Sequence, residues 1–395
     1  MFESILFRRN STHPGQTAVD VGAIIEALLF YGSTHVMVDR SSLLELLVKF
    51  GDEVLFELIS GGYLKVTYVE SWNGIMTDSP GSGPPLHSPV FFTSSNHQFP
   101  DVLRTSCIEV HGKSGRGRRA ASRLEKVFHV HQHDQVIADG VRDVFLNDQY
   151  MSVAARSVLG NLVPGVDFSA ASFFARKVGD RFVVESDLDW LAVNRQYHQF
   201  VSPKHSAINP AYILSNIFNV ECDLYFASVS SSELHTSLLN SRLISARINF
   251  VVQHRMRSQL ELNRFQSALF PGAKSVREAV NSGKVSVLEL LPVIESSCKF
   301  KKWLHGRPFD ADLLAEYHKE VTKETIVDRL PGKTTRFAIF TGLGVVLDSF
   351  ATAGVATTAG LAIGAFDGLF LDKLLKGWKP NQFIESKLGP ALKKA

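Results

Sequence analysis

Five basic side chains lie close together in the sequence and could contact phosphate groups. The stretch at 107–119 reads CIEVHGKSGRGRR, and one more arginine follows it. The basic residues are Lys113, Arg116, Arg118, Arg119 and Arg123. Arg116, Arg119 and Arg123 are spaced to share one face of a helix. Such a face suits the phosphates of a nucleic acid, a nucleotide or a lipid headgroup, and a solvated surface helix would produce the same pattern.

Three alternating histidines follow in the stretch FHVHQHD at 128–134. A strand would present His129, His131 and His133 on one side, as a metal site requires. On a helix, only His129 and His133 would share a face. A metal site is therefore one hypothesis, and a polar surface stretch that senses pH is the other.

Established catalytic motifs are incomplete or absent. A phosphate-binding P-loop would need a glycine where Cys107 stands. His111 and Lys113 begin the HxKxxxxD signature of phospholipase-D-like enzymes, but Arg118 occupies the position of its aspartate. The sequence also lacks GxSxG, HExxH, an EF-hand loop and a GxGxxG after a strand. No cofactor is expected, and the sequence favours a non-enzymatic protein while leaving carboxylate-based catalysis open.

The segment 337–371 is unlike the rest of the chain, because Asp348 and Asp367 are its only charged residues. Small residues recur in it at a spacing of four, which places them on one helical face. They are Ala356, Gly360, Gly364 and Gly368. Each glycine costs about 1 kcal/mol relative to alanine inside a helix. The pattern therefore predicts close packing of this helix against another one.

Basic residues flank this apolar segment on both sides, as expected for a hairpin that enters and leaves a membrane on the cytoplasmic side. Residues 337–347 would make only about 16 Å of helix, against a hydrocarbon core of about 30 Å, so two full spans do not fit. A re-entrant hairpin, a single span and a helical hairpin buried in the protein remain as alternatives. In composition the segment resembles the Ala/Gly-rich hydrophobic hairpin of pore-forming colicins. That resemblance implies a hairpin stored inside a helical bundle until it is needed.

The elements that position these residues can be predicted from periodicity and capping. The N-terminal part alternates helices at 21–31, 43–50 and 53–60 with strands at 35–39 and 63–70. A hairpin is expected at 173–185, around the turn Gly179-Asp180. From 209 onward we expect helices, including one that begins at Ser231 or Ser232 and reaches about 270.

The predicted fold class is α+β. It combines a small N-terminal α/β unit, a central mixed region with a β-hairpin, and a largely helical C-terminal half that ends in the Gly/Ala-rich apolar helical hairpin. The expected domains are a possible sensor region at 1–100, the mixed region with the basic helix at 101–205, a helical region at 206–330, and the apolar hairpin with a basic tail at 331–395.

Composition restricts the function classes. The chain of 395 residues is 45% hydrophobic and 21% charged, which excludes wholesale disorder and a polytopic membrane protein. Its net charge of +3 argues against a dedicated nucleic-acid binder. The three cysteines, Cys107, Cys222 and Cys298, are widely spaced and odd in number, which is typical of a reducing compartment. We therefore expect a cytoplasmic protein that associates with a membrane on activation.

Two functional hypotheses follow. The first is a non-enzymatic sensor and effector in which 337–371 packs on a protein partner, mediates self-association or inserts into membrane, as in bacterial antiphage defence. The second is an enzyme acting on a nucleotide or nucleic acid, with the basic cluster and the histidines as its site. A nucleic-acid or nucleotide partner is the weaker expectation.

Overall fold

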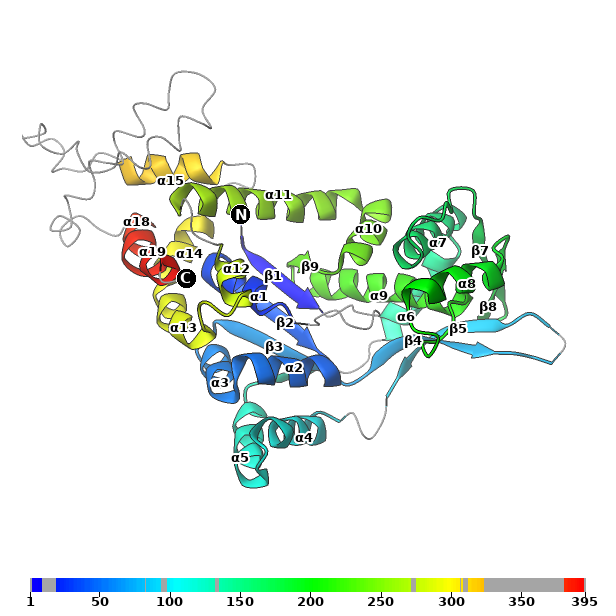
Figure 1. Ribbon diagram of the computed structural model, residues 1–395, viewed down its shortest axis with the longest axis horizontal. Coiled ribbons are helices and arrows are strands. Elements are labelled where there is room, and N and C mark those ends of the chain that lie inside the picture. The colour runs from blue at the N-terminus through cyan, green and yellow to red at the C-terminus, as the bar shows by residue number, and fades with distance from the viewer. Residues whose placement is uncertain are drawn as a thin grey trace, which may run out of the picture.

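A computed structural model describes most of the chain. The described residues are 2–8, 19–81, 83–93, 98–131, 135–270, 275–305, 307, 312–322 and 380–393. They form an α+β structure with two sheets and many helices (Figure 1). The predicted fold class is therefore confirmed, including the strand and helix order of the N-terminal unit.

The first sheet has five parallel strands in the order β6-β3-β2-β1-β9. Their bounds are β1 Ser4–Arg8, β2 Ser33–Val38, β3 Leu64–Val69, β6 His129–His131 and β9 Glu233–His235. The central strands are rich in β-branched and aromatic residues and are buried on both faces, as is typical of parallel sheets. Along β1, Ile5 and Phe7 enter one hydrophobic core while Leu6 enters the other.

The strand order determines which helices cover each face. Strands β1, β2, β3 and β6 follow one another in one direction across the sheet, so right-handed crossovers place their connecting helices on one face. The chain then crosses back to β9, which places the intervening helices on the opposite face. The two hydrophobic cores correspond to these two faces.

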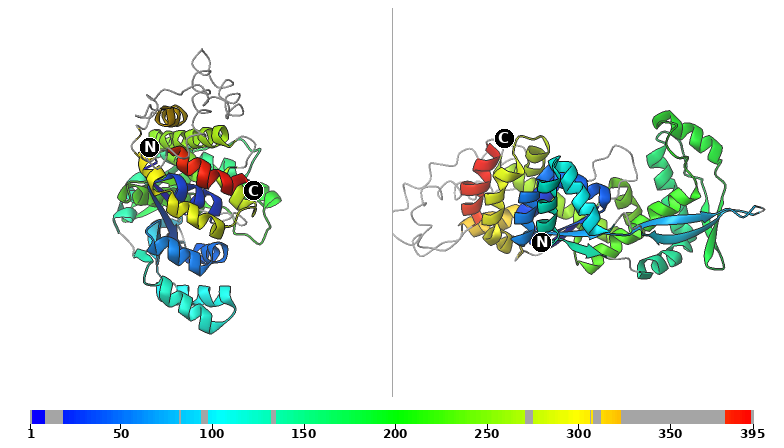
Figure 2. Two further views of the ribbon diagram at one scale, coloured as in Figure 1. Left: turned by 90° about the vertical axis from the view of Figure 1, so that its left-hand side faces the viewer. Right: turned by 90° about the horizontal axis from the view of Figure 1, so that it is seen from below.

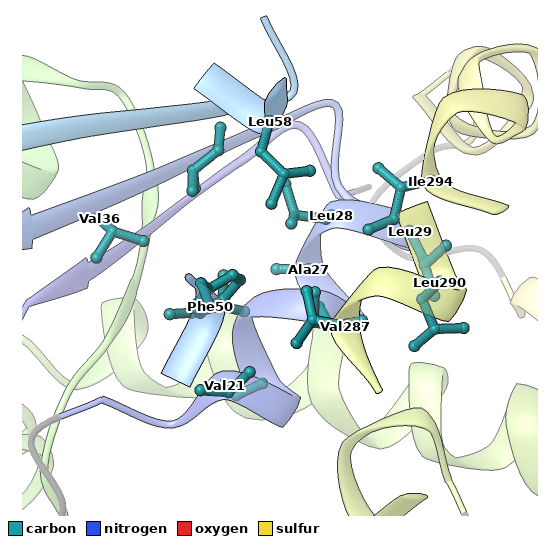
Figure 3. Packing of buried hydrophobic residues seen from close by; sticks show 14 of the residues in the cluster. Val21, Ala27, Leu28, Leu29, Val36, Phe50, Leu58, Val287, Leu290 and Ile294 are labelled. Carbon is teal, nitrogen blue, oxygen red and sulfur yellow. The ribbon is translucent and has the colours of Figure 1, made fainter. Parts of the chain in front are cut away.

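The first face carries the N-terminal helices and most of the C-terminal ones. The helices are α1 Val21–Phe30, α2 Arg40–Phe50, α3 Asp52–Ser60, α4 Phe99–His111, α5 Ser114–Leu124, α11 Asn249–Leu269, α12 Val276–Asn281, α13 Val287–Ser296, α14 Cys298–His305 and α15 Leu313–Thr322. Helix α1 is entirely buried, and Figure 3 shows its Leu29 beside Leu290 and Ile294 of α13. This face therefore holds the larger core.

The second face carries five further helices and the second sheet. The helices are α6 Gln135–Phe145, α7 Asp148–Leu162, α8 Trp190–Phe200, α9 Pro210–Val229 and α10 Leu238–Arg247. The antiparallel sheet has the order β4-β5-β8-β7, with β4 Trp72–Asp78, β5 Leu86–Phe92, β7 Phe173–Val178 and β8 Arg181–Ser186. The predicted hairpin is confirmed, and Gly179 has the positive φ of 65° that its turn requires. The second sheet extends away from the parallel sheet (Figures 1 and 2).

The C-terminal end of the chain returns to the larger core. It forms α18 Pro380–Phe383, a π-helical segment Ile384–Leu388 and α19 Gly389–Lys393. The ring of Phe383 stacks on Phe300 of α14 at 4.9 Å. Because α18 also contacts α15, the chain leaves the described structure at Thr322 and re-enters it at Pro380 beside the same helix.

The apolar segment 337–371, with its ridge of Ala356, Gly360, Gly364 and Gly368, lies outside the described residues. Its predicted packing and membrane insertion therefore remain predictions. In the part of the chain that the structure describes, no helix has the length and hydropathy needed to cross a membrane.

One predicted region needs correction. Within the range 206–330, the helix expected to begin at Ser231 or Ser232 is absent there, because Glu233–His235 forms β9 and pairs with β1. Ser231 and Ser232 precede this strand, and the next helix begins instead at the N-cap Ser237. A three-residue strand with the sequence ELH has too little hydrophobic alternation to be recognised, and its partner strand determines its conformation.

Helices α4 and α5 pack closely through Gly117. A Cβ atom at this position would lie 2.5 Å from the Ile108 Cα atom in α4. Gly117→Ala should therefore destabilise the protein by about 1–3 kcal/mol through overpacking. The control is Gly115→Ala in the same helix, where a Cβ atom meets nothing within 4 Å and alanine should stabilise by up to about 1 kcal/mol. Equal unfolding midpoints in denaturant for the two variants would show that the close contact is wrong.

Candidate functional site: the carboxyl edge of the parallel sheet

The carboxyl ends of the parallel strands meet at one edge of the sheet, where open α/β sheets bind their ligands. Polar residues occur at this edge in three neighbouring strands. Arg8 ends β1, Asp39 follows β2, and Glu70 and Ser71 follow β3. This edge of the sheet is therefore the candidate site.

A pocket of about 860 Å³ lies at this edge, where β2 and β3 end. Its walls are side chains within 39–44 at the start of α2, within 68–72 at the junction of β3 and β4, and within 101–109 of α4. This volume is within the range of pockets that hold small organic ligands.

Several charged groups of the lining hold the walls in place. Asp39 caps α2, because its Oδ1 accepts the backbone N–H groups of Ser41 at 3.0 Å and Ser42 at 2.8 Å. Glu70 Oε1 accepts the backbone N–H of Phe99 at 3.0 Å and so fixes the beginning of α4. These two carboxylates therefore link the sheet edge to the two helices that form the pocket.

Asp101 and Arg104 are paired with each other on α4, with the Asp101 Oδ1 atom 2.6 Å from Arg104 Nη2. Both side chains are more than half exposed, so the pair contributes little to stability. The negative charge of Asp101 and the positive charge of Arg104 nevertheless cancel each other within the pocket wall. Tyr68 also lines the pocket, and burial raises the pKa of its hydroxyl further above neutral pH.

The remaining lining groups include two exposed charged side chains, one partly exposed aromatic ring and one buried hydroxyl. Arg40 and Glu109 are exposed, and among the described residues neither forms an ion pair. Trp72 is 43% exposed, and its ring lies against Phe92 with centroids 5.8 Å apart and an angle of 22° between the planes. The Ser71 side chain is buried, and its hydroxyl has no hydrogen-bond partner within the described ranges. The pocket thus offers a flat aromatic surface, a guanidinium group and a carboxylate.

A buried ion pair fills the point where the strand order reverses, between β1 and β9. Arg8 Nη1 donates to Asp223 Oδ1 at 2.7 Å and to the Asn219 carbonyl oxygen at 3.1 Å. The second oxygen of Asp223 accepts from Thr236 Oγ1 at 2.7 Å and Asn240 Nδ2 at 2.9 Å. Burial acts to lower the pKa of Arg8. The electrostatic interactions with Asp223, Cys222 and Asp39 and the hydrogen bond to Asp223 together outweigh burial, so the pKa is raised. This network joins β1 to α9 and has a structural role.

The predicted anion-binding residues lie on α5 and at its N-terminus. Lys113, Arg116, Arg118, Arg119 and Arg123 are all exposed, while Gly117, Ala120, Ala121 and Leu124 form the buried face. The Arg123 guanidinium lies over the Phe56 ring, 4.5 Å from its centroid. Anion binding by this helix remains a prediction.

Of the two conformations considered for the histidines, the structure has the strand for His129 and His131. His129 and His131 belong to β6 and pair with Thr67 and Val69 of β3. The His131 ring meets Phe226 of α9 edge to face at 4.8 Å, so the histidines are on the opposite face of the sheet from α5. His133 lies outside the described residues. Across the described ranges, no three His, Cys, Asp or Glu side chains are grouped to hold a metal ion.

His35 lies on the same face of the sheet and, unlike His129 and His131, is buried. Its Nε2 atom lies 2.8 Å from Thr67 Oγ1. Burial lowers its pKa to about 4, helped by the nearby charges of Lys65 and His129. The ring is therefore neutral at pH 7 and acts as a buried hydrogen-bonding group.

The residues that line the carboxyl-edge pocket are not among those predicted from the sequence as site residues. The signal that would have found them is the polar residue directly after each predicted strand, namely Asp39 after HVMV and Glu70-Ser71 after LKVTYV. The wall formed by α4 carries no comparable signal, because only the fold brings 101–109 to the sheet edge.

Comparisons with protein-family models, with curated proteins and with solved structures find no match to this chain. Its function must therefore be argued from the geometry of the sites.

Proposed function

We propose that this chain is a ligand-binding sensor protein whose carboxyl-edge pocket binds a nucleoside or nucleoside monophosphate. The observation that carries the proposal is the pocket of about 860 Å³ at the ends of β2 and β3, with Trp72, Arg40 and Glu109 in its lining. An aromatic ring can stack on a base, a guanidinium group binds phosphate, and a carboxylate accepts hydrogen bonds from ribose hydroxyls or base amino groups.

The charge of the lining limits the number of phosphates. Carboxylates outnumber guanidinium groups in the described lining, since Asp39, Glu70, Asp101 and Glu109 face only Arg40 and Arg104. A triphosphate would meet net repulsion there, whereas one phosphate could pair with Arg40. The pocket therefore favours a ligand of low negative charge.

The composition of the lining supports binding over catalysis. Among the described residues the pocket is lined by no histidine, cysteine or lysine, and three of its four carboxylates cap a helix or pair with arginine. Ser71 has no base beside its hydroxyl in the same part of the chain. Nucleophilic or general acid-base catalysis would need such partners.

The alternative function, an enzyme that uses the basic cluster and the histidines, has less support. The cluster on α5 and the histidines of β6 belong to opposite faces of the parallel sheet. A single site that contains both would require a ligand that reaches around the sheet.

We further propose that 337–371 is the output element, which packs on a protein partner or inserts into membrane when the sensor is activated. Helices α15 and α18, between which this segment lies in the sequence, contact each other, so the described residues on its two sides are neighbours. A cytoplasmic sensor that stores such a segment would suit a triggered effector, for example in bacterial antiphage defence.

Trp72→Ala should weaken binding of AMP and adenosine about tenfold or more, because stacking on an aromatic ring contributes about 1–3 kcal/mol per base. Isothermal titration of the full chain with adenosine, AMP and ATP measures this directly. Phe200→Ala is the matched control, since Phe200 is an exposed aromatic residue on α8, away from the pocket lining.

Arg40→Ala separates phosphate recognition from base recognition. The Arg40→Ala variant should bind AMP more weakly than the wild type does and bind adenosine nearly as tightly. The wild type should bind AMP more tightly than ATP. Equal affinities of the wild type and Trp72→Ala, or no binding of any of these probes, would refute the proposed ligand class.

A further inference from the structure

A second pocket, of about 530 Å³, lies among α1, α11 and α12. It shares no lining residue with the carboxyl-edge pocket. Its described lining is polar and includes Glu26, Gln259, Asn263, Gln266, Ser275 and Asn281. Such a lining suits a small, hydrophilic ligand.

Glu26 of α1 is the distinctive group in this pocket, because its carboxylate is buried and is only 4% exposed. Its Oε1 accepts from Gln259 Nε2 at 3.2 Å, and its Oε2 accepts from Gln266 Nε2 at 2.8 Å. Both donors are neutral amides, and within the described residues no cation pairs with Glu26. A buried carboxylate without a counter-charge is costly, and each of its oxygens can accept a further hydrogen bond.

The other charges of the lining do not neutralise Glu26. Arg277 is paired with Asp20, whose Oδ2 atom lies 2.5 Å from Arg277 Nη2 and 2.9 Å from Nε. Glu278 accepts the backbone N–H of Ser275 at 3.2 Å and so caps α12. The pocket therefore has a net negative charge with amide and hydroxyl groups around it.

We propose that this pocket binds a small organic ammonium ion, such as a linear polyamine, with Glu26 as the anchoring anion. The ammonium group would donate charge-assisted hydrogen bonds to the two Glu26 oxygens, which are stronger than bonds between neutral groups. Asn263 Oδ1 accepts from Gln259 Nε2 at 3.0 Å, and Asn281 Oδ1 accepts the backbone N–H of Gly22 at 2.8 Å. Each amide oxygen can accept a second hydrogen bond, which the remaining N–H groups of the ligand would donate. This site is independent of the nucleoside site proposed above.

A lysine of the chain itself is a candidate competitor for Glu26. Lys274 immediately precedes Ser275 in the sequence and lies outside the described residues. Its side chain carries the type of charge that would compete for Glu26. The experiment therefore includes the variant Lys274→Met.

The test is calorimetric titration of the full chain with spermidine, together with the shift in melting temperature that spermidine produces. Glu26→Gln should weaken binding tenfold or more and abolish the shift, because it keeps the shape and removes the charge. Glu57→Gln is the control, because it removes the same charge from an exposed glutamate of α3 that does not line the pocket. Lys274→Met should bind spermidine at least as tightly as the wild type.

A second variant covers the case in which Glu26→Gln does not fold. Asn263 is exposed at the pocket, so Asn263→Leu should fold and still weaken spermidine binding severalfold. A neutral diol of the same length should not bind. The proposal is overturned if Glu26→Gln and Glu57→Gln bind spermidine equally, or if Mg²⁺ binds in place of the amine. It is also overturned if Lys274→Met binds spermidine and the wild type does not, since the cation of the pocket would then be Lys274 itself.

Discussion

Replacing Arg8 by methionine should lower the free energy of unfolding by about 3–5 kcal/mol, because it leaves Asp223 as a buried charge without its partner. The Asp223 side chain is 0% exposed and that of Arg8 only 12%. The pair joins the central strand β1 to α9, which covers the second face of the sheet. Loss of the pair should therefore loosen the contact between the sheet and this layer.

Denaturant unfolding of Arg8→Met, Asp223→Asn and the double variant measures this pair. Each single change should be strongly destabilising, and the double change should cost clearly less than the sum. Arg176→Met is the control, because Arg176 is 44% exposed and its pair with Asp148 should contribute less than about 1 kcal/mol. Similar losses for Arg8→Met and Arg176→Met would show that the Arg8 pair is not buried as described.

The second large effect concerns the C-terminal tail. A chain that ends at Lys333 loses Phe383, Ile384, Leu388 and Leu392, all of which are at most 3% exposed in the larger core. Each such side chain contributes about 1.5–3 kcal/mol, so the loss is comparable with the stability of a typical domain, about 5–15 kcal/mol. We expect this truncation to be unfolded or insoluble.

An internal deletion of 337–371, closed by a short Gly/Ser linker, should retain the fold, because α15 and α18 lie beside each other. It is therefore the proper variant for testing the output segment. Fractionation of cells should show membrane association of the full chain on activation and none of the internal deletion. Normal folding of the truncation at Lys333, measured by circular dichroism and thermal unfolding, would contradict the role of the tail.

Local sequence signals predicted the elements with clear capping and periodicity. Helix α1 begins after the N-cap Asp20, and α12 and α13 begin with capping boxes formed by Ser275 with Glu278 and by Ser286 with Glu289. Helix α2 starts at Arg40, earlier than the predicted 43, because Asp39 caps it. These features depend on neighbours in sequence, which is why they could be predicted.

The features that depend on distant neighbours could not be predicted. Strands β1 and β9 are short, and the sheet defines them by pairing residues more than two hundred positions apart, such as Leu6 with Leu234. The carboxyl-edge pocket likewise joins Asp39, Glu70 and Asp101 from three separate segments. The order of the strands brings these residues together, and no local pattern encodes that order.

The most direct test of the central proposal is hydrogen exchange of the full chain with and without saturating AMP. The account predicts slower exchange of backbone amides in 39–44, 68–72 and 101–109, the three segments that line the carboxyl-edge pocket. The same experiment on Trp72→Ala should show little protection at an equal AMP concentration. Protection confined to other segments, or no protection in the wild type, would contradict the proposal that this pocket is the sensing site.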